Sequence, residues 1–210
     1  MNIESGLFEN GLVDADEKLN LIHKLMNDNN WEVVTDDGNI KIERKFTKNC
    51  PLACFRSSGF VNANAEELLD YVSKIYENAE SIKRYDIDVS HYEIVEKLSE
   101  NSRLCYQINS MQWPIWPRDT LYVQIMKNFG ENYWLYMYSD ESPIRPKRDD
   151  QYVRAIINIS AYGFYPEKDG CRVYRLAQID PCGSIPTSVV NSYAEKTASV
   201  IKLLQQIYPA

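Results

Sequence analysis

The amino-acid sequence predicts an α+β protein in which a curved antiparallel sheet wraps around a long C-terminal helix. From residue 87 to about residue 180, apolar and polar residues alternate with the period of two that is typical of strands. Short turns such as Asn128-Phe-Gly130-Glu join these strands, so neighbouring strands are expected to pair antiparallel. The pattern then changes to a helical period that continues to residue 208.

The N-terminal part of the chain mixes helices with strands. Apolar residues recur at helical spacing after Asp14, and an alternating strand follows the Asp-Asp-Gly-Asn turn that ends at Asn39. Asn64 is suited to cap a helix, because its side chain can accept a hydrogen bond from a free backbone N–H. The elements expected here are a helix at 14–27, strands at 40–46 and 53–61, a helix at 65–73, and a less regular helical stretch that reaches residue 83.

The remaining elements follow from the alternation and from the C-terminal apolar stripe. A charged, proline-bearing stretch at 140–150 is expected to form a loop. Thr187 is the expected N-cap of the last helix. We expect strands at 89–97, 102–110, 119–128, 131–139, 151–163 and 171–180, followed by one continuous helix at 187–208.

The composition is that of an ordinary globular protein and disfavours nucleic-acid binding. The chain has 210 residues, so we expect residues 1–210 to form one domain. Its formal net charge of −7 would repel nucleic-acid phosphates. Aromatic residues make up 12% of the chain, which fits either a β-rich domain or a pocket lined by rings with polar tips.

The cysteine and histidine contents give no metal site. The five cysteines include no Cys-x-x-Cys pair, and the two histidines, His23 and His91, lie far apart in the sequence. The N-terminus lacks the features of a signal peptide, and no apolar run is long enough to span a membrane. Reduced thiols in the cytosol fit these observations, so we expect a cytoplasmic protein.

Five segments of the sequence, in their order and spacing, carry a family resemblance. They are Trp31, Arg84-Tyr85-Asp86, Trp113-Pro-Ile-Trp-Pro117-Arg118-Asp119, the stretch from Ser139 to Arg154, and Asp180-Pro-x-Gly183-x-Ile-Pro186. Together they resemble the START domain family of lipid-binding and lipid-transfer proteins, and the resemblance covers most of the chain. It implies a helix-grip fold, in which the sheet holds the C-terminal helix and encloses a tunnel for one lipid, and it implies no cofactor.

The resemblance also identifies candidate lipid-binding residues. Between Tyr85 and Val123 the chain is most similar to the ceramide-transfer members. Gln107 matches a glutamine of those members, and Asp86 replaces their glutamate. Three further polar residues of their tunnel, an arginine, an asparagine and a tyrosine, align here with Ile82, Met137 and Arg175.

Gln107 and Gln124 are candidate headgroup ligands on the inner face of neighbouring strands. Sterol-binding members carry a facing Asp and Arg at these positions, so the two amides favour a neutral or zwitterionic lipid over a sterol. Leaving a buried amide unpaired costs about 1–3 kcal/mol, so each must find a partner. The two amides can bond to each other or can hold a ceramide-like or phospholipid headgroup.

Three charged candidates have two interpretations each. Asp86 can have a structural role, by capping a strand or pairing with Arg84, or it can contact the lipid. Arg154 and Arg175 lie on late strands, where each can be a surface residue. If either points inward, it needs an acid partner or a ligand phosphate, and a phospholipid becomes the favoured ligand.

Trp113, Ile115 and Trp116 are candidate membrane contacts in a loop stiffened by two prolines. One tryptophan can anchor the loop from inside, or the loop can be an exposed apolar tip that enters a bilayer interface, where indole is favoured. We expect a monomer that carries one lipid and touches the membrane surface transiently and peripherally. The alternative function is a helix-grip hydrolase or cyclase with Asp86 as base, but no nucleophile motif supports catalysis.

Overall fold

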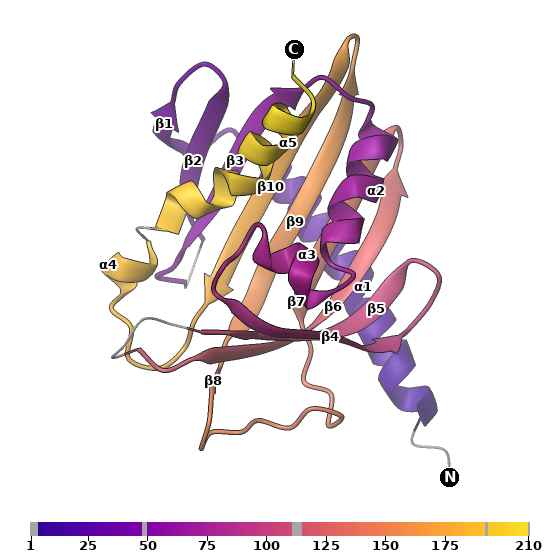
Figure 1. Ribbon diagram of the computed structural model, residues 1–210, viewed down its shortest axis with the longest axis vertical. Coiled ribbons are helices and arrows are strands. Elements are labelled where there is room, and N and C mark those ends of the chain that lie inside the picture. The colour runs from indigo at the N-terminus through magenta and orange to yellow at the C-terminus, as the bar shows by residue number, and fades with distance from the viewer. Residues whose placement is uncertain (1–3, 48–49, 111–114, 192, 210) are drawn as a thin grey trace.

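One curved sheet of ten strands dominates this computed structural model, which describes residues 4–47, 50–110, 115–191 and 193–209 (Figure 1). The strands are β1 (Glu32–Asp36), β2 (Ile40–Phe46), β3 (Ala53–Val61), β4 (Val89–Lys97), β5 (Ser102–Asn109), β6 (Arg118–Phe129), β7 (Asn132–Ser139), β8 (Val153–Arg154), β9 (Ile156–Glu167) and β10 (Gly170–Asp180). Their order is β1-β2-β3-β10-β9-β7-β6-β5-β4, with every pair antiparallel, and β8 pairs parallel with β6. The predicted curved antiparallel sheet is therefore confirmed.

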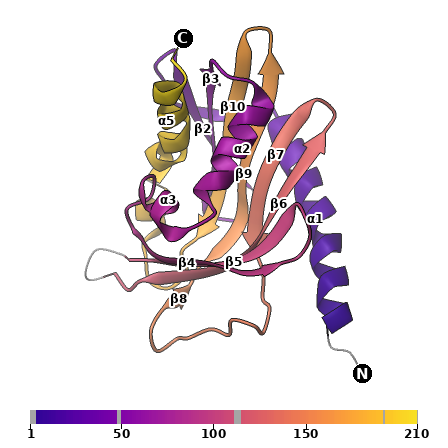
Figure 2. The ribbon, with the colours of Figure 1, turned by 45° about the vertical axis from the view of Figure 1, so that its right-hand side comes forward.

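Helices lie on both faces of the sheet. The helical elements are α1 (Glu4–Met26), α2 (Ala65–Ile75), α3 (Ala79–Lys83), α4 (Thr187–Val190), a 3₁₀ segment (Tyr193–Ala198) and α5 (Ser199–Ile207). Figures 1 and 2 show α2, α3 and α5 on the concave face and α1 on the opposite, convex face. No helix of the described residues is both long and apolar enough to cross a membrane.

Strand β7 contributes buried side chains to both faces of the sheet. Leu135 and Met137 join the apolar core on the concave face, whereas Trp134, Tyr136 and Tyr138 join the core on the convex face. All five side chains are buried. Since successive side chains of a strand point to opposite faces, a sheet covered on both sides needs large apolar residues at consecutive positions. This double burial accounts for much of the aromatic content.

The helix that begins after Asn64 confirms its predicted cap. The Asn64 side chain accepts a hydrogen bond of 2.8 Å from the Glu67 backbone N–H. Leu68 and Val72 are fully buried on the face of α2 that packs against the sheet. The cap satisfies a backbone donor that the helix itself leaves free, so the helix can begin at this point of the chain.

Close packing holds α1 against the convex face. At Gly163 of β9, an added Cβ atom would lie 2.7 Å from the ring of Trp134. The Trp134 ring in turn meets His23 of α1, whose ring lies 4.0 Å from that of Phe129, centroid to centroid. The glycine therefore makes room for the indole between the sheet and the helix.

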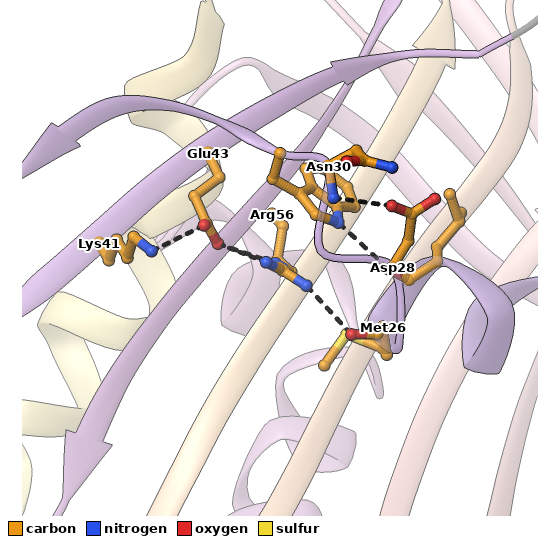
Figure 3. Close-up of polar contacts among 8 residues, drawn as sticks. Met26, Asp28, Asn30, Lys41, Glu43 and Arg56 are labelled. Carbon is orange, nitrogen blue, oxygen red and sulfur yellow. Dashed lines mark hydrogen bonds and ion pairs between the residues drawn. The ribbon is translucent and has the colours of Figure 1, made fainter.

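A polar cluster fixes the end of α1 (Figure 3). Arg56 donates from Nε to Glu43 at 2.8 Å and from Nη1 to the backbone carbonyl of Met26 at 3.2 Å. Lys41 makes a second ion pair with Glu43 at 2.8 Å. The Arg56 guanidinium also lies 4.5 Å from the ring centre of Trp31. The cluster ties the helix to strands β2 and β3.

The predicted C-terminal helix is present, but it is interrupted, whereas the sequence predicted one continuous helix. It divides into α4, the 3₁₀ segment and α5. The Asn191 side chain accepts a hydrogen bond from the Ala53 backbone N–H at 2.9 Å, and Thr197 bonds to Ser57 of β3. Such side-chain bonds compete with a regular helix. The N-cap is Pro186, which offers no side-chain hydrogen bond, rather than Thr187.

Candidate functional site

A cavity of about 470 Å³ lies on the concave face, between the sheet and the elements α3, α4, α5 and the 3₁₀ segment. Its volume falls within the range of roughly 300–1,000 Å³ that is usual for ligand sites. Most of its wall is apolar. Apolar lining residues include Ala53, Phe55, Ile75, Ile82, Met137, Ile157, Ala177 and Val200.

A chain of hydrogen bonds lines one side of the cavity. Asn109 donates to Asp86 at 3.3 Å, and Gln107 donates to Asn109 at 2.8 Å. The Tyr122 hydroxyl completes the chain by donating to Gln107 at 3.3 Å. Burial raises the pKa of Asp86 above its ordinary value. These groups can donate to and accept from the hydroxyl, amide or ester groups of a ligand.

Two residues of this hydrogen-bond chain, Asn109 and Tyr122, were not among the candidate lipid-binding residues identified from the sequence. Asn109 shares a strand face with Gln107, so the alternation of β5 could have identified it. Tyr122 lies on β6 and is fully buried, and burial raises its pKa. Its hydroxyl therefore stays protonated and acts as a hydrogen-bond donor.

Arg175 reaches the cavity from β10. Its Nη2 donates to the Ser160 hydroxyl at 3.0 Å, and its guanidinium lies 4.5 Å from the ring centre of Tyr162. The Tyr162 hydroxyl is 3.1 Å from that of Tyr76, whose pKa burial raises. Met137 of β7 also lines the cavity and accepts a weak hydrogen bond from Ser160 at 3.7 Å.

Gln124 does not line the cavity, although its face was predicted correctly. It shares the concave face with Tyr122 but accepts a hydrogen bond from Arg103. Arg103 also donates to the carbonyl of Ser73 at the end of α2. Gln107 and Gln124 do not bond to each other, because Gln107 lies opposite Thr120 in the sheet.

Arg154 also lies away from the cavity. It makes a bidentate ion pair with Asp119, with distances of 3.0 and 2.8 Å, and its side chain is 10% exposed. Tyr106 donates to the same carboxylate at 3.0 Å. The acid partner that the sequence left open is thus Asp119, and this pairing removes the reason to assign Arg154 to the ligand.

Exposed apolar side chains lie at or next to the residues that line the cavity. Ile115 lines the cavity and is half-buried, while Trp116 is 55% exposed. Trp113 lies outside the described residues. Ile87 and Val189 line the cavity from other segments and are also exposed, at 88% and 38%. The sequence drew attention only to the tryptophan loop, because the other side chains come from distant parts of the chain.

Arg118 and Lys196 make polar contacts among the segments around the cavity. Arg118 donates to the backbone carbonyls of Trp116, Pro181 and Cys182, which ties the tryptophan loop to the loop after β10. Burial lowers the pKa of this guanidinium. Lys196 of the 3₁₀ segment forms an ion pair with Asp88 at 2.8 Å.

Sequence comparisons give a family and two kinds of relative. The model of the START domain family matches residues 15–201. Human ceramide transfer protein is 22% identical over 193 residues, covering 80% of this chain and 30% of that protein. Human START domain-containing protein 10 is 30% identical over 149 residues, covering 70% of this chain and 48% of that protein. The chain therefore spans less than half the length of these relatives.

Solved structures show the same fold. The crystal structure of human STARD10 matches with a TM-score of 0.77 at 22% identity, covering 91% of this chain and 78% of the other. Human StAR-related lipid transfer protein 5 matches with a TM-score of 0.79 at 16% identity, covering 95% and 98%. A curved sheet that holds a C-terminal helix over a cavity defines a helix-grip protein. Since the family model covers most of the sequence, the chain belongs to the START domain family.

Proposed function

We propose that this chain binds one lipid in the cavity on its concave face and carries it between membranes. The observation that supports this function best is the cavity itself, which combines an apolar wall with a chain of hydrogen-bonding groups. The wall replaces the bilayer around acyl chains, a transfer worth about 0.8 kcal/mol for each buried CH₂ group. The chain of Asp86, Asn109, Gln107 and Tyr122 replaces part of the headgroup hydration.

The ligand we propose is a neutral or zwitterionic lipid rather than a sterol. Human ceramide transfer protein is named for ceramide, and the similarity to it brings a ceramide-like lipid into consideration. The cavity carries Gln107 and Asp86, as the family resemblance implies for such a ligand, but it also carries Arg175. Both a ceramide-like lipid and a phospholipid remain within this function.

Exchange of the lipid requires contact with a membrane. Ile87 and Val189 line the cavity, Trp116 follows the lining residue Ile115, and all three side chains are exposed. We propose that they form a rim that inserts into the bilayer interface. The net charge of −7 gives little attraction to anionic membranes, and docking would therefore depend on apolar insertion. The protein would act as a cytoplasmic monomer of one domain that associates with membranes peripherally.

A helix-grip enzyme is the alternative function. Asp86 would then be the base, and its raised pKa would suit that role. Its oxygens, however, accept hydrogen bonds from Asn109 and from the Asp88 backbone N–H. No nucleophile stands in this network, so a binding role accounts for the groups better.

Lipid transfer between vesicles tests the proposed function. A fluorescent phospholipid or ceramide is placed in donor vesicles, and its arrival in unlabelled acceptor vesicles is followed with and without the protein. The wild-type protein should accelerate transfer of at least one of the two lipids. Gln107→Leu should slow transfer and leave the melting temperature nearly unchanged, because it removes a cavity amide but keeps most of the volume.

Gln206→Leu is the matched control, since Gln206 is exposed on α5 and does not line the cavity. It should transfer lipid at the wild-type rate. If the wild-type protein accelerates neither lipid, the carrier function is rejected. Turnover of the added lipid into a new product would favour the enzyme instead.

A further inference from the structure

Arg175 brings a positive charge to the cavity that the described residues do not neutralise. No carboxylate among them forms an ion pair with its guanidinium. Its acceptors are neutral: the Ser160 hydroxyl at 3.0 Å, the Ala161 carbonyl at 3.4 Å and the Leu176 carbonyl. The ring of Tyr162 adds a cation–π contact. None of these partners carries a negative charge, so they leave the guanidinium without a counterion.

Arg118, a second arginine that lines the cavity, has a structural role. Every guanidinium nitrogen of Arg118 donates to a loop carbonyl, namely those of Pro181, Trp116 and Cys182. In Arg175, Nε donates to no group of the described residues. Arg118 thus uses all three of its nitrogens to hold two loops together, whereas the Nε of Arg175, a residue that lines the cavity, has no acceptor among the described residues.

The surroundings of Arg175 determine what ligand would suit it. A guanidinium beside an apolar wall is unfavourable unless an anion meets it, and its planar fork matches two oxygens of a phosphate or a carboxylate. Met137, on the same stretch of wall, offers only a sulfur atom that is already in contact with Ser160. Ceramides carry hydroxyl and amide groups, and sterols carry a hydroxyl group. Neither carries an anionic group, so neither would neutralise this charge.

We propose that the carried lipid is a phospholipid and that two phosphate oxygens of its headgroup bind Arg175. This inference rests on the proposed lipid-carrying function and makes Arg175 the residue that selects phosphate-bearing lipids over ceramide. The chain of Gln107, Asn109 and Asp86 then serves the remaining polar groups of the lipid. The acyl chains lie against the apolar wall.

Lipid loading from mixed vesicles tests the selection. The purified protein is incubated with an excess of vesicles that contain phosphatidylcholine, ceramide and a fatty acid in equal amounts, with matched acyl chains. The protein is re-isolated, and its bound lipids are extracted and quantified by mass spectrometry. The wild-type protein should carry phosphatidylcholine in excess over ceramide.

Two substitutions at Arg175 and one control give the decisive comparison. Arg175→Gln should lower the ratio of bound phosphatidylcholine to ceramide about tenfold, because charge-assisted hydrogen bonds to phosphate are lost. Arg175→Lys keeps the charge but loses the planar guanidinium, so its ratio should lie between those of the wild type and Arg175→Gln. Arg172→Gln removes an arginine of the same strand that is paired with Glu167 outside the cavity, and it should leave the ratio unchanged.

Other outcomes separate the selection from the function. If Arg175→Gln and Arg175→Lys both load lipids in the wild-type ratio, the phosphate site is rejected while lipid binding stands. Preferential loading of the fatty acid would reject phosphate in favour of carboxylate. If inorganic phosphate alone raises the wild-type melting temperature through Arg175 and no phosphatidylcholine loads, the site binds a free ion and the inference fails. A wild-type protein that loads no lipid at all rejects the carrier function together with it.

Discussion

Arg56 and Arg175 lie on two adjacent strands of the same sheet, yet their surroundings are opposite. Arg56 of β3 pairs in register with Leu176 and faces the convex side, where Glu43 neutralises it at 2.8 Å. Arg175 of β10 pairs in register with Ser57 and faces the concave side, where it meets only neutral groups. One guanidinium completes an ion pair within the fold, and the other does not.

The contrast separates residues that hold the fold from residues that await a ligand. The convex face is closed: α1, the ring of Trp134 and the Glu43–Arg56 pair fill it. The concave face contains a cavity of about 470 Å³ whose polar groups are only partly paired with one another. Groups on the convex face should therefore govern stability, and groups on the concave face should govern binding.

Replacing Arg56 with methionine should lower the stability of the fold far more than the same replacement of Arg175. Arg56→Met should lower the free energy of unfolding by about 3 kcal/mol, because it leaves the buried carboxylate of Glu43 with Lys41 alone. Arg175→Met in lipid-stripped protein should change it by less than about 1 kcal/mol, since an unneutralised charge is removed. Urea unfolding of both variants measures the difference, and equal losses would contradict the contrast between the two faces.

A smaller loss of stability is expected from adding a methyl group at Gly163, against the ring of Trp134. Gly163→Ala should cost about 2 kcal/mol, because its Cβ would lie 2.7 Å from the indole and neither the sheet nor α1 can easily move. Thermal unfolding measures the loss. Lipid loading of the folded variant should match that of the wild type, since Gly163 faces away from the cavity. A variant as stable as the wild type would show that the convex face is loosely packed.

Part of the pH dependence of stability should trace to His23 on the convex face. Burial lowers the pKa of His23 below its ordinary value of 6.5, so protonation is harder in the folded state than in the unfolded chain. Its contribution is complete above about pH 6.5 and is lost as the pH falls through the lower folded value. Between about pH 8 and pH 5, His23→Gln should therefore lose less stability than the wild type.

His91 provides the control for this pH effect. It is 48% exposed and lies 3.2 Å from Glu93. His91→Gln should keep the wild-type loss of stability on acidification. If instead His91→Gln flattens the pH profile and His23→Gln does not, the convex face is not the source of the pH dependence.

The smallest change in stability is expected at the rim of the cavity. Trp116 is 55% exposed, so Trp116→Ala should alter the free energy of unfolding by less than about 0.5 kcal/mol. It should nevertheless slow lipid transfer between vesicles, by roughly threefold, because an indole is lost from the membrane interface. Leu21→Ala, an exposed apolar change on α1, should leave transfer unchanged. A transfer rate equal to that of the wild type would exclude Trp116 as a membrane contact.

The sequence predicted strands better than it predicted the site. The alternation of β5 correctly predicted that Gln107 lies at the cavity. The alternation of β6 predicted the face on which Gln124 lies, but it could not predict that Gln124 bonds to Arg103 and does not line the cavity. Arg154 comes from the two-residue strand β8, and its partner Asp119 lies far away in the sequence. Periodicity cannot report a contact between distant segments.

The same physical limit explains the broken C-terminal helix. Its apolar stripe was read correctly, and Val200, Ile201 and Leu204 are buried. The bond of Asn191 to the Ala53 backbone N–H depends on where β3 lies in space. A helical period describes one face of one segment and cannot show where a tertiary hydrogen bond interrupts it.

Native mass spectrometry of the intact protein tests whether the cavity holds one phospholipid through Arg175. The purified chain is incubated with phosphatidylcholine vesicles, separated from them and transferred to the gas phase without denaturation. We expect a single adduct with the mass of one phosphatidylcholine molecule, strongly reduced in Arg175→Gln and retained in Arg172→Gln. A folded wild-type protein that carries no lipid, or several lipids bound equally well by Arg175→Gln, would contradict it.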